Sequence, residues 1–403
     1  MANAIPTDPR YSCLAGLIGK LAPCQLSGRE ENMEIQLGAP GQIIPPVDRG
    51  ISLGIKMEEL GYDALWWPDH LMGWHPDTMW NEDFTPLAKH QPSSHVHVDP
   101  FAMMAAIGSQ TSQIRVGTCV TDLLRRHPAS IAQTMLTLDH MTKGRAILGL
   151  GSGEQLNIQP YGIEWDKPVA KLAEGLEIIR LLMTAGNQTV DFEGKHFRLQ
   201  DAVMGLDPYG DSPPEIWLAA HGPRMLSLTG QYADGWLPTK MSPEAYRDSL
   251  ERIRASAREA NRNDENFTPG MLGYLLVGPD EESVNRLLAS EMVRMLCILM
   301  PNWVFEGLGL EPPLGNEGGF HDFIPSRIPR PEVERIIEAI PPKVSAHYAF
   351  AGTVEQLVEE IASYHAAGLR HLVMWNITGL GDPDLARFSF DAMNELQTEL
   401  KRL

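Results

Sequence analysis

Cysteine and long apolar runs are both scarce in this sequence. The 403 residues include four cysteines, Cys13, Cys24, Cys119 and Cys297, which lie far apart and show no metal-ligand spacing. Few, scattered cysteines in a long chain are typical of a reduced protein, so we expect a cytoplasmic location and no disulfide framework. No apolar run approaches the ~20 residues of a membrane span, which argues against stable membrane insertion.

Positive charge is also in short supply. Lys and Arg number 33 against 52 Asp and Glu, which gives a formal net charge of −19. An acidic surface repels phosphate backbones and anionic lipid, so nucleic acid and membrane surfaces are poor partners. Apolar residues make up 43% and charged residues 21%, which is ordinary for a globular protein and argues against disorder. Any anionic ligand must therefore be held by local donors against the overall field.

The first 32 residues lack a clean periodicity. A signal-peptide interpretation fails because Lys20 interrupts the apolar stretch and Pro23 stands where a small residue is needed. We expect residues 1–32 to be a loose, uncharged tail, with Met33 as an alternative start. One enlarged domain then covers residues 33–403.

From Met33 onward, short apolar runs alternate with amphipathic segments. Strands are predicted at 34–39, 64–67, 114–120, 145–150, 215–219, 235–237, 271–277 and 371–375. Helical segments separate most of these strands, including one over 281–295, and the Pro- and Gly-rich residues 300–330 are expected to form a loop. Strands separated by helices pair in parallel, and eight such units favour a closed (β/α)8 TIM barrel over an open doubly wound sheet, which stays the alternative. Insertions are expected near 69–98, 184–214 and 297–340.

A glycine-rich turn over residues 149–154 follows one predicted strand. A dinucleotide-binding fingerprint requires a helix directly after the turn, but the next segment contains Pro160, Gly162 and Pro168. We therefore interpret the glycines as a place where the backbone comes very close to a flat ligand.

Polar and aromatic residues follow the predicted strands. Asp69, His70 and Trp74 follow the second strand, and Glu154 lies in the glycine-rich turn. The carboxyl ends of barrel strands form the active site, so these residues are expected to converge, with Glu154 as a general-acid candidate. Structural alternatives stay open, because His70 could be a helix cap or a buried structural histidine and Trp74 could be a core residue.

Two further patterns have alternative interpretations. Arg125 and Arg126 could be a solvated helix entry or, in an acidic protein, an anion clamp. A metal site is the tempting interpretation of a histidine-rich loop, but the loop is Pro-rich and lacks a helical i, i+4 pair. We expect no metal from its residues His90, His95, His97 and Asp99.

Several motifs occur together in one order. They are Asp69-His70, Gly117 to Thr121, Pro128-Ala129-x-x-Ala132-Gln133, Gly144-Arg145 and Gly149-x-Gly151-x-Gly153-Glu154. Over residues 33–400 they resemble the bacterial luciferase-like superfamily, and more closely its coenzyme F420-dependent branch. Within that branch the string Ala219 to Met225 is most similar to the phthiodiolone ketoreductases.

The resemblance implies a barrel with an insertion after strand seven, and a homodimer. It implies hydride transfer between the deazaflavin F420 and a small-molecule or lipid-like ketone or secondary alcohol. It also implies a non-prolyl cis peptide at Cys119-Val120 and catalytic roles for His70, Trp74 and Glu154. His70 would act on the proton of the substrate oxygen, Trp74 would shape the face near the ring, and Glu154 would serve the proton at the deazaflavin.

The same resemblance implies a set of cofactor contacts. They are Asp69, Cys119, Val120, Ser152, Gly153, Asn157, Ala219, Ala220, His221, Gly222 and Pro223. Lys240 is the substrate candidate, although it matches a phosphate-binding lysine only after a gap, and a sugar phosphate is disfavoured. Because F420 is itself a polyanion, backbone N–H groups near Gly222 must supply a local positive mouth, with help from Arg125, Arg126 and Arg224.

Two other functions remain as alternatives. One is an FMN-dependent luciferase-like monooxygenase, which would bind flavin mononucleotide in place of F420. The other is a non-catalytic flavin- or deazaflavin-binding relative. Retention of His70 and Glu154 argues against the second of these.

Overall fold

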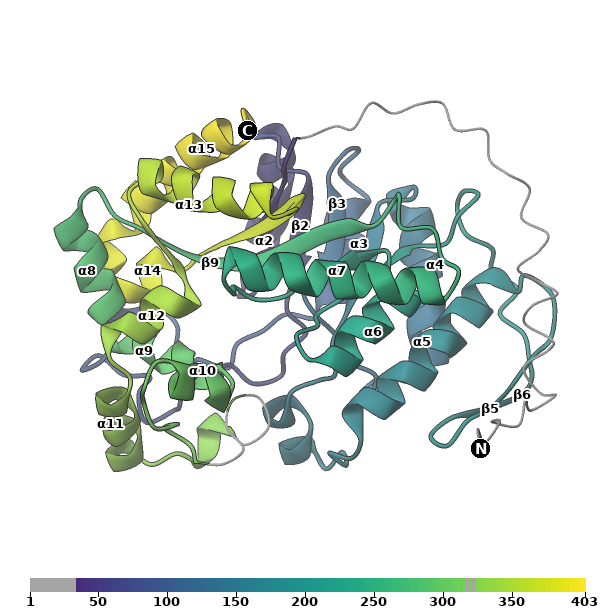
Figure 1. Cartoon of the computed structure of the whole chain (residues 1–403), viewed down its shortest axis with the longest axis horizontal. Coiled ribbons are helices and arrows are strands. Elements are labelled where there is room, and N and C mark those ends of the chain that lie inside the picture. Colours follow the sequence, from purple (N-terminus) through teal and green to yellow (C-terminus); the bar gives the residue numbers. More distant parts are fainter. Residues whose placement is uncertain (1–33, 316–318, 320–322) are drawn as a thin grey trace, which may run out of the picture. The chain divides into compact units, whose positions relative to one another are not determined.

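The computed structural model describes residues 34–315, 319 and 323–403, so the predicted tail over 1–32 lies outside the described residues. Eight parallel strands close into a barrel, because the last strand pairs with the first and β8 pairs with β9. In barrel order they are β1 (Gln36–Pro40), β2 (Ala64–Trp67), β3 (Arg115–Thr118), β4 (Ala146–Leu150), β7 (Glu215–Leu218), β8 (Gly235–Trp236), β9 (Thr268–Val277) and β11 (His371–Asn376). The predicted (β/α)8 fold is confirmed (Figure 1).

Helices cover the outside of this sheet. Proline is the first residue of several of them, where its missing N–H costs nothing and its fixed φ suits a helix start. The main covering helices are α2 (Val47–Glu59), α3 (Pro100–Gly108), α4 (Pro128–Thr142), α5 (Pro168–Thr184), α6 (Pro223–Tyr232), α7 (Pro243–Glu259), α13 (Val354–Ala366) and α15 (Ala386–Leu400). No helix in the described ranges is long and apolar enough to cross a membrane.

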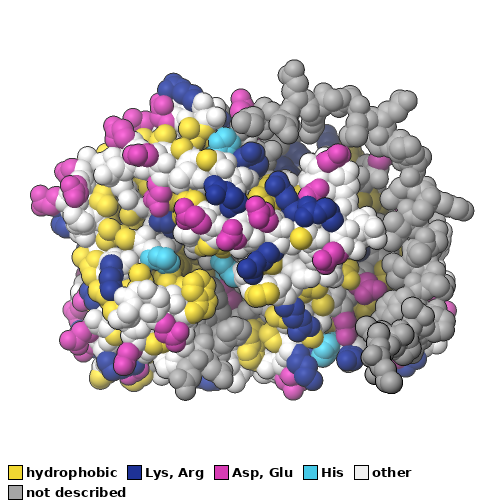
Figure 2. All heavy atoms as spheres, in the orientation of Figure 1, with side chains coloured by type: hydrophobic (Ala, Val, Ile, Leu, Met, Phe, Trp, Pro, Cys, Tyr) yellow, Lys and Arg dark blue, Asp and Glu magenta, His cyan; other side chains and the backbone are white. Residues whose placement is uncertain are grey.

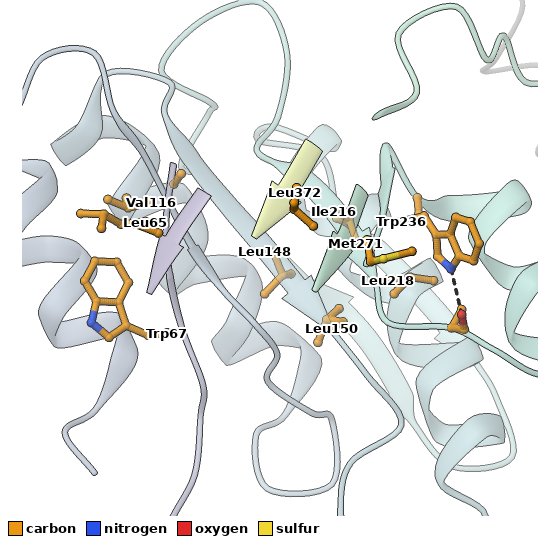
Figure 3. Packing of buried hydrophobic residues seen from close by; sticks show 14 of the residues in the cluster. Leu65, Trp67, Val116, Leu148, Leu150, Ile216, Leu218, Trp236, Met271 and Leu372 are labelled. Atoms are coloured by element: carbon orange, nitrogen blue, oxygen red, sulfur yellow. Dashed lines mark hydrogen bonds between the residues drawn. The ribbon is translucent and has the colours of Figure 1, made fainter. Parts of the chain in front are cut away.

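Successive strand residues alternate between two apolar layers. In β2, Leu65 and Trp67 join the large cluster beneath the helices, whereas Ala64 and Trp66 join a small cluster inside the barrel. Both faces are buried, which explains why these strands read as continuous apolar runs. Figure 3 shows the outer layer, in which Leu148 lies among neighbouring strand residues.

Large aromatic rings fill the amino end of the barrel interior. The ring centroids of Trp66 and Trp217 lie 5.2 Å apart, and Trp66 Nε1 donates a hydrogen bond to His371 Nε2 at 3.0 Å. Glycine supplies the space for them, since a Cβ on Gly235 would come within 2.4 Å of the Trp217 ring. Trp66, Trp217 and His371 thus close this end of the barrel as a packed plug.

The exposed face of α7 carries charges of both signs. Figure 2 shows basic and acidic side chains interleaved over this helix, whose charged residues are Arg, Asp and Glu. Alternating charges keep an outer helix face in water while Tyr246, Leu250 and Ile253 on its other side are buried. The overall charge of −19 is therefore not concentrated on this face.

The largest insertion lies between β9 and β11, at the left of Figure 1. It has its own apolar cluster, which includes Val293, Leu296 and Phe305. Its elements are α8 (Glu281–Ala289), α9 (Glu291–Leu296), α10 (Asn302–Gly307), α11 (Arg330–Ala339), α12 (Pro342–Tyr348) and β10 (Phe350–Gly352).

Two local predictions were wrong, and one element was not predicted. The helix predicted over 281–295 is broken at Ser290, whose backbone is extended with φ −57° and ψ 131°. The loop predicted over 300–330 contains α10, because Val304 and Phe305 find apolar partners in the insertion. An unpredicted antiparallel hairpin, β5 (Val190–Glu193) with β6 (Arg198–Ala202), lies within the insertion near 184–214.

Candidate active site

A cavity opens at the carboxyl ends of the barrel strands. Loops after β2, β3, β4, β7 and β8 line it, together with β9 and the end of α12. The sequence-predicted residues that line it are Asp69, His70, Trp74, Cys119, Val120, Ser152, Gly153, Glu154, Asn157, Ala219 and His221. Ala220, Gly222, Pro223 and Lys240 are not among the lining residues.

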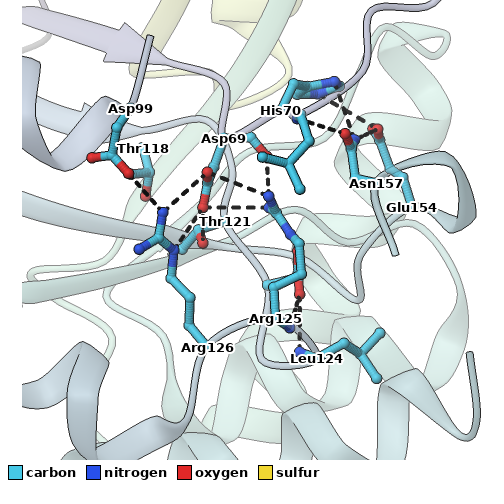
Figure 4. A network of polar contacts seen from close by, with 12 residues as sticks. Asp69, His70, Asp99, Thr118, Thr121, Leu124, Arg125, Arg126, Glu154 and Asn157 are labelled. Atoms are coloured by element: carbon cyan, nitrogen blue, oxygen red, sulfur yellow. Dashed lines mark hydrogen bonds and ion pairs between the residues drawn. The ribbon is translucent and has the colours of Figure 1, made fainter. Parts of the chain in front are cut away.

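His70 and Glu154 face each other in this cavity. His70 Nε2 lies 3.5 Å from Glu154 Oε2, and Asn157 Nδ2 donates a hydrogen bond to the same oxygen at 3.0 Å (Figure 4). The amide of Asn157 is fixed, because its Oδ1 accepts the backbone N–H groups of Leu71 at 2.8 Å and Met72 at 3.0 Å. The loop after β2 and the glycine-rich turn after β4 are thereby held together.

Burial reverses the usual order of the pKa values of these two groups. Burial lowers the pKa of His70 to about 4, whereas burial raises the pKa of Glu154 to about 7. At neutral pH the imidazole is therefore uncharged and the carboxyl group is close to half protonated. Such a pair can hold one exchangeable proton and release it within the cavity, as general acid–base catalysis requires.

Aromatic rings enclose His70. Trp74 meets it edge-on at 5.1 Å between ring centroids, and His97 stacks on it at 5.3 Å. His95 instead accepts a bond from Gly73 N and faces Asp77 at 3.1 Å. Among the described residues no group of three His, Cys, Asp or Glu side chains could hold a metal. His97 is the histidine of this loop that packs on His70.

Asp69 is the centre of an ion-pair network behind the cavity (Figure 4). Burial alone would raise the pKa of Asp69, but the charges of Arg125 and Arg126 and a bond donated by Thr121 lower it below its ordinary value. Arg125 also bonds to Asp122 at 2.6 Å, and Arg126 reaches Asp99 at 2.9 Å. The anion-clamp interpretation of Arg125 and Arg126 was wrong, because aspartates already occupy both guanidinium groups.

One wall of the cavity is backbone and small side chains. The peptide bond between Cys119 and Val120 is cis, as the resemblance implied. A Cβ on Gly149 would come within 1.8 Å of Thr118 O, and Gly153 has φ +91°, so both positions require glycine. The glycine-rich turn thus places its backbone against Val120 and leaves a smooth wall.

The amino end of α6 lies beside the cavity residue His221. Gly222 precedes the helix without a side-chain cap, and Pro223 begins it. Arg224 is exposed and forms no ion pair with any other residue that the structure describes. His221 Nε2 contacts Thr239 Oγ1 at 3.1 Å. Uncapped N–H groups and a free arginine make this helix start suitable for an anion.

Lys240 does not reach the cavity. Its Nζ lies 2.7 Å from Glu360 Oε1 and donates to the carbonyl oxygens of Ala349 at 2.8 Å and Ala346 at 3.2 Å. The ammonium also lies over the Phe350 ring, 4.7 Å from its centroid. The partners of Lys240, the substrate candidate, are therefore groups of the protein itself.

The lining residues that were missed include Leu237, Leu272, Tyr274 and Tyr348. Leu272 and Tyr274 lie on the predicted strand 271–277, and their place near a strand end was a usable signal. Tyr348 ends α12 within the insertion, where the sequence gives no strand-end signal.

Comparisons with known proteins agree with this architecture. Residues 30–371 match the family described as luciferase-like monooxygenase. A phthiodiolone/phenolphthiodiolone dimycocerosates ketoreductase of Mycobacterium bovis (strain BCG / Pasteur 1173P2) is 35% identical over 337 residues, 83% of this chain and 88% of that protein. An F420-dependent glucose-6-phosphate dehydrogenase of Nakamurella multipartita is 29% identical over 328 residues, 80% of this chain and 84% of that protein.

A solved structure supports the fold. An F420-dependent secondary alcohol dehydrogenase in complex with an F420-acetone adduct has a TM-score of 0.71 and 22% identity, covering 91% of this chain and 99% of that one. At that identity the likeness concerns the fold alone, whereas the family match extends over most of the sequence. The chain belongs to the luciferase-like monooxygenase family, as its motifs predicted.

Proposed function

We propose that this chain is a coenzyme F420-dependent oxidoreductase that transfers a hydride between the deazaflavin and a ketone or secondary alcohol. The observation that carries the proposal is the His70–Glu154 pair, which holds an exchangeable proton in the cavity at the carboxyl ends of the strands. Interconversion of a ketone and an alcohol requires one proton at the substrate oxygen beside the hydride. The names of the ketoreductase and of the F420-dependent dehydrogenase to which this chain is similar support the same chemistry.

The cavity fits a flat anionic cofactor. Its wall of Val120 and the glycine-rich turn is smooth, and Ala219 keeps the end of the neighbouring strand β7 small. The uncapped start of α6 at Gly222, with the exposed Arg224, offers donors for phosphate. When bound, the deazaflavin supplies or accepts the hydride.

The protein side chains handle the proton. We assign His70 Nε2 to the substrate oxygen, where the neutral imidazole can hold or release a proton. Glu154 is the carboxyl group that exchanges this proton, and Asn157 fixes its orientation. Trp74 packs edge-on against His70 and, with the stacked His97, keeps water away from the imidazole.

The test is a titration of the purified protein with F420, NADP and flavin mononucleotide, followed by turnover of secondary alcohols and ketones. We expect F420 to bind and to be reduced by an alcohol, with the loss of its oxidised absorbance as the signal. Tight binding of flavin mononucleotide without binding of F420 would overturn the proposal and favour the monooxygenase. Binding of F420 with no turnover of any alcohol or ketone would favour the non-catalytic relative.

The proposal extends to location and assembly. Four scattered cysteines support a cytoplasmic protein, and the family resemblance supports a homodimer. Light scattering of the purified protein should give a mass near twice 44.7 kDa. A mass that stays at one chain over a wide concentration range would exclude the dimer.

A further inference from the structure

Two tyrosines form a pair on the cavity wall. Tyr274 comes from β9, and Tyr348 is the last residue of α12 in the insertion. Both line the cavity, and their rings stack with centroids 5.0 Å apart and planes 15° apart. The exposed fractions of the two residues are only 4% and 7%. The barrel and the insertion therefore each contribute one phenol to the same wall.

The hydroxyl groups of this pair lack the partners that other buried tyrosines have. Tyr246 donates to Gly270 O at 3.1 Å, and Tyr364 donates to Met241 O at 2.6 Å. In the described part of the chain, the hydrogen-bonding partner of the Tyr274 and Tyr348 hydroxyl groups is the other tyrosine of the pair, and neither donates to a backbone carbonyl as Tyr246 and Tyr364 do. A hydroxyl group has one donor and two acceptor positions, so this pair keeps hydrogen-bonding capacity for a partner that enters the cavity.

The cavity residues around them offer no free cation. Arg125, the lining cation, is held by Asp69 and Asp122, and Leu237 and Leu272 add apolar surface. Burial raises the pKa of both phenols, so each stays a neutral donor at physiological pH. A neutral acceptor oxygen suits this wall, whereas a phosphate or carboxylate would find no free cation there.

The pair also lies at a useful distance from the proton relay. Both groups pack edge-on against the Trp74 indole, whose ring centroid lies 6.2 Å from Tyr274 and 5.1 Å from His70. One substrate that lies along the indole can therefore place its reacting oxygen at His70 and a second oxygen at the phenols.

We propose that Tyr274 and Tyr348 form a second polar subsite, which selects neutral ketones that carry an additional acceptor oxygen away from the reacting carbonyl. The additional oxygen is an ether, ester, hydroxyl or carbonyl oxygen. This inference rests on the proposed ketone–alcohol function, because that function places the reacting carbonyl at His70. Since Tyr348 belongs to the insertion, the selection of substrate depends on a segment outside the eight barrel units.

The test uses a positional series of substrates. Nonan-2-one is compared with analogues in which an ether oxygen replaces one methylene group, from carbon 4 to carbon 8. With reduced F420 we expect one oxygen position to raise kcat/KM about tenfold over nonan-2-one, because two neutral hydrogen bonds are gained. The gain should appear mainly in KM, since the phenols bind the substrate before and during the reaction.

Three variants give the test its controls. In the double variant Tyr274→Phe/Tyr348→Phe the tenfold preference should fall to about one, and each single variant should lie between. Tyr364→Phe removes a buried hydroxyl group that bonds to Met241 O outside the cavity, so it should keep the full preference. A preference that survives in the double variant, or that disappears equally in Tyr364→Phe, overturns the subsite.

A binding measurement separates this inference from the proposed function. Titration calorimetry of the same ketones into purified protein without added cofactor reports the preference when no hydride is transferred. If no ketone is reduced yet the binding preference depends on the two phenols, the proposed function fails while the subsite stands. Equal affinity for every analogue in the unmodified protein overturns the subsite alone.

Discussion

Each end of the barrel buries a histidine, and the two histidines differ in what surrounds them. His371 begins β11 at the amino end, and His70 follows β2 at the carboxyl end. Burial lowers the pKa of His371 to about 3 and that of His70 to about 4. Both imidazoles are therefore uncharged at neutral pH, so neither charge nor burial separates them.

The difference lies in the neighbouring groups. His371 Nε2 accepts a bond from Trp66 Nε1, which leaves its proton on Nδ1, and this nitrogen has no hydrogen-bond partner in the structure as described. The carboxylate at that end, Glu215, is occupied by Arg115 at 2.7 Å and by the indole of Trp217. His70 instead faces Glu154, whose raised pKa lets it gain or lose a proton near neutral pH. A buried histidine is structural when none of its partners can gain or lose a proton near neutral pH. It can take part in proton transfer when one of its partners can.

The largest predicted effect comes from removing the titrating partner. Glu154→Gln keeps the shape of the side chain and the hydrogen bond from Asn157 but removes the exchangeable proton. We expect turnover of a ketone to fall about 10²-fold or more, as the loss of a general acid does, while F420 affinity changes less. Steady-state kinetics and a cofactor titration measure the two quantities.

A carboxylate at the other end of the barrel supplies the matched control. Glu215→Gln removes a charge from the plug beside His371, where no chemistry is proposed, so turnover should stay within about threefold after correction for folded protein. Equal losses of turnover in both variants would mean that Glu154 affects turnover only through protein stability. The two ends of the barrel would then not differ in function.

The second prediction concerns acid stability. A depressed histidine pKa stabilises the folded state above the unfolded value of 6.5, and that contribution is lost as the pH falls toward the folded value. At pH 5 the loss due to His371 is about 2 kcal/mol, from 1.36 kcal/mol per pH unit below 6.5. His371→Gln keeps an acceptor for Trp66, so its unfolding free energy should fall about 2 kcal/mol less between pH 7 and pH 5.

Urea unfolding of both proteins at the two pH values measures this difference. His70, His75 and His97 remain in both proteins, so their own acid sensitivity cancels in the comparison. An identical loss in the two proteins would show that the folded barrel does not lower the pKa of His371.

The third prediction is a pH–rate profile. Ketone reduction needs the protonated form of Glu154, and the pKa of that group is about 7. kcat/KM should therefore be level below pH 7 and fall about tenfold per pH unit above it, whereas alcohol oxidation should show the opposite slope. A profile measured from pH 6 to pH 9 that is flat in both directions would remove Glu154 from the proton transfer.

The barrel strands and the site residues that follow them could be predicted because the sequence patterns that indicate them are local. Strands such as β2 are continuous apolar runs, and His70 and Glu154 come directly after such runs. The ion pairs of Arg126 could not be predicted, because its partners Asp69 and Asp99 lie 57 and 27 residues away and meet it only in the folded chain. Tyr348 was missed for the same reason, since apolar packing within the insertion decides where α12 ends.

The smallest predicted effect concerns Lys240, which lies near the functional end of the barrel but whose environment resembles that of the plug. Its charge is held by Glu360 and by the Ala349 carbonyl, as the charge of Arg115 is held by Glu215. Lys240→Met should keep the aliphatic packing and lower the unfolding free energy by about 1 kcal/mol, since Glu360 is one third exposed and water compensates for part of the loss. Ketone kcat/KM should change less than twofold. A loss of kcat/KM of tenfold or more at unchanged stability would mean that Lys240 leaves Glu360 to bind substrate. Lys240 would then be a functional cation and not a structural one.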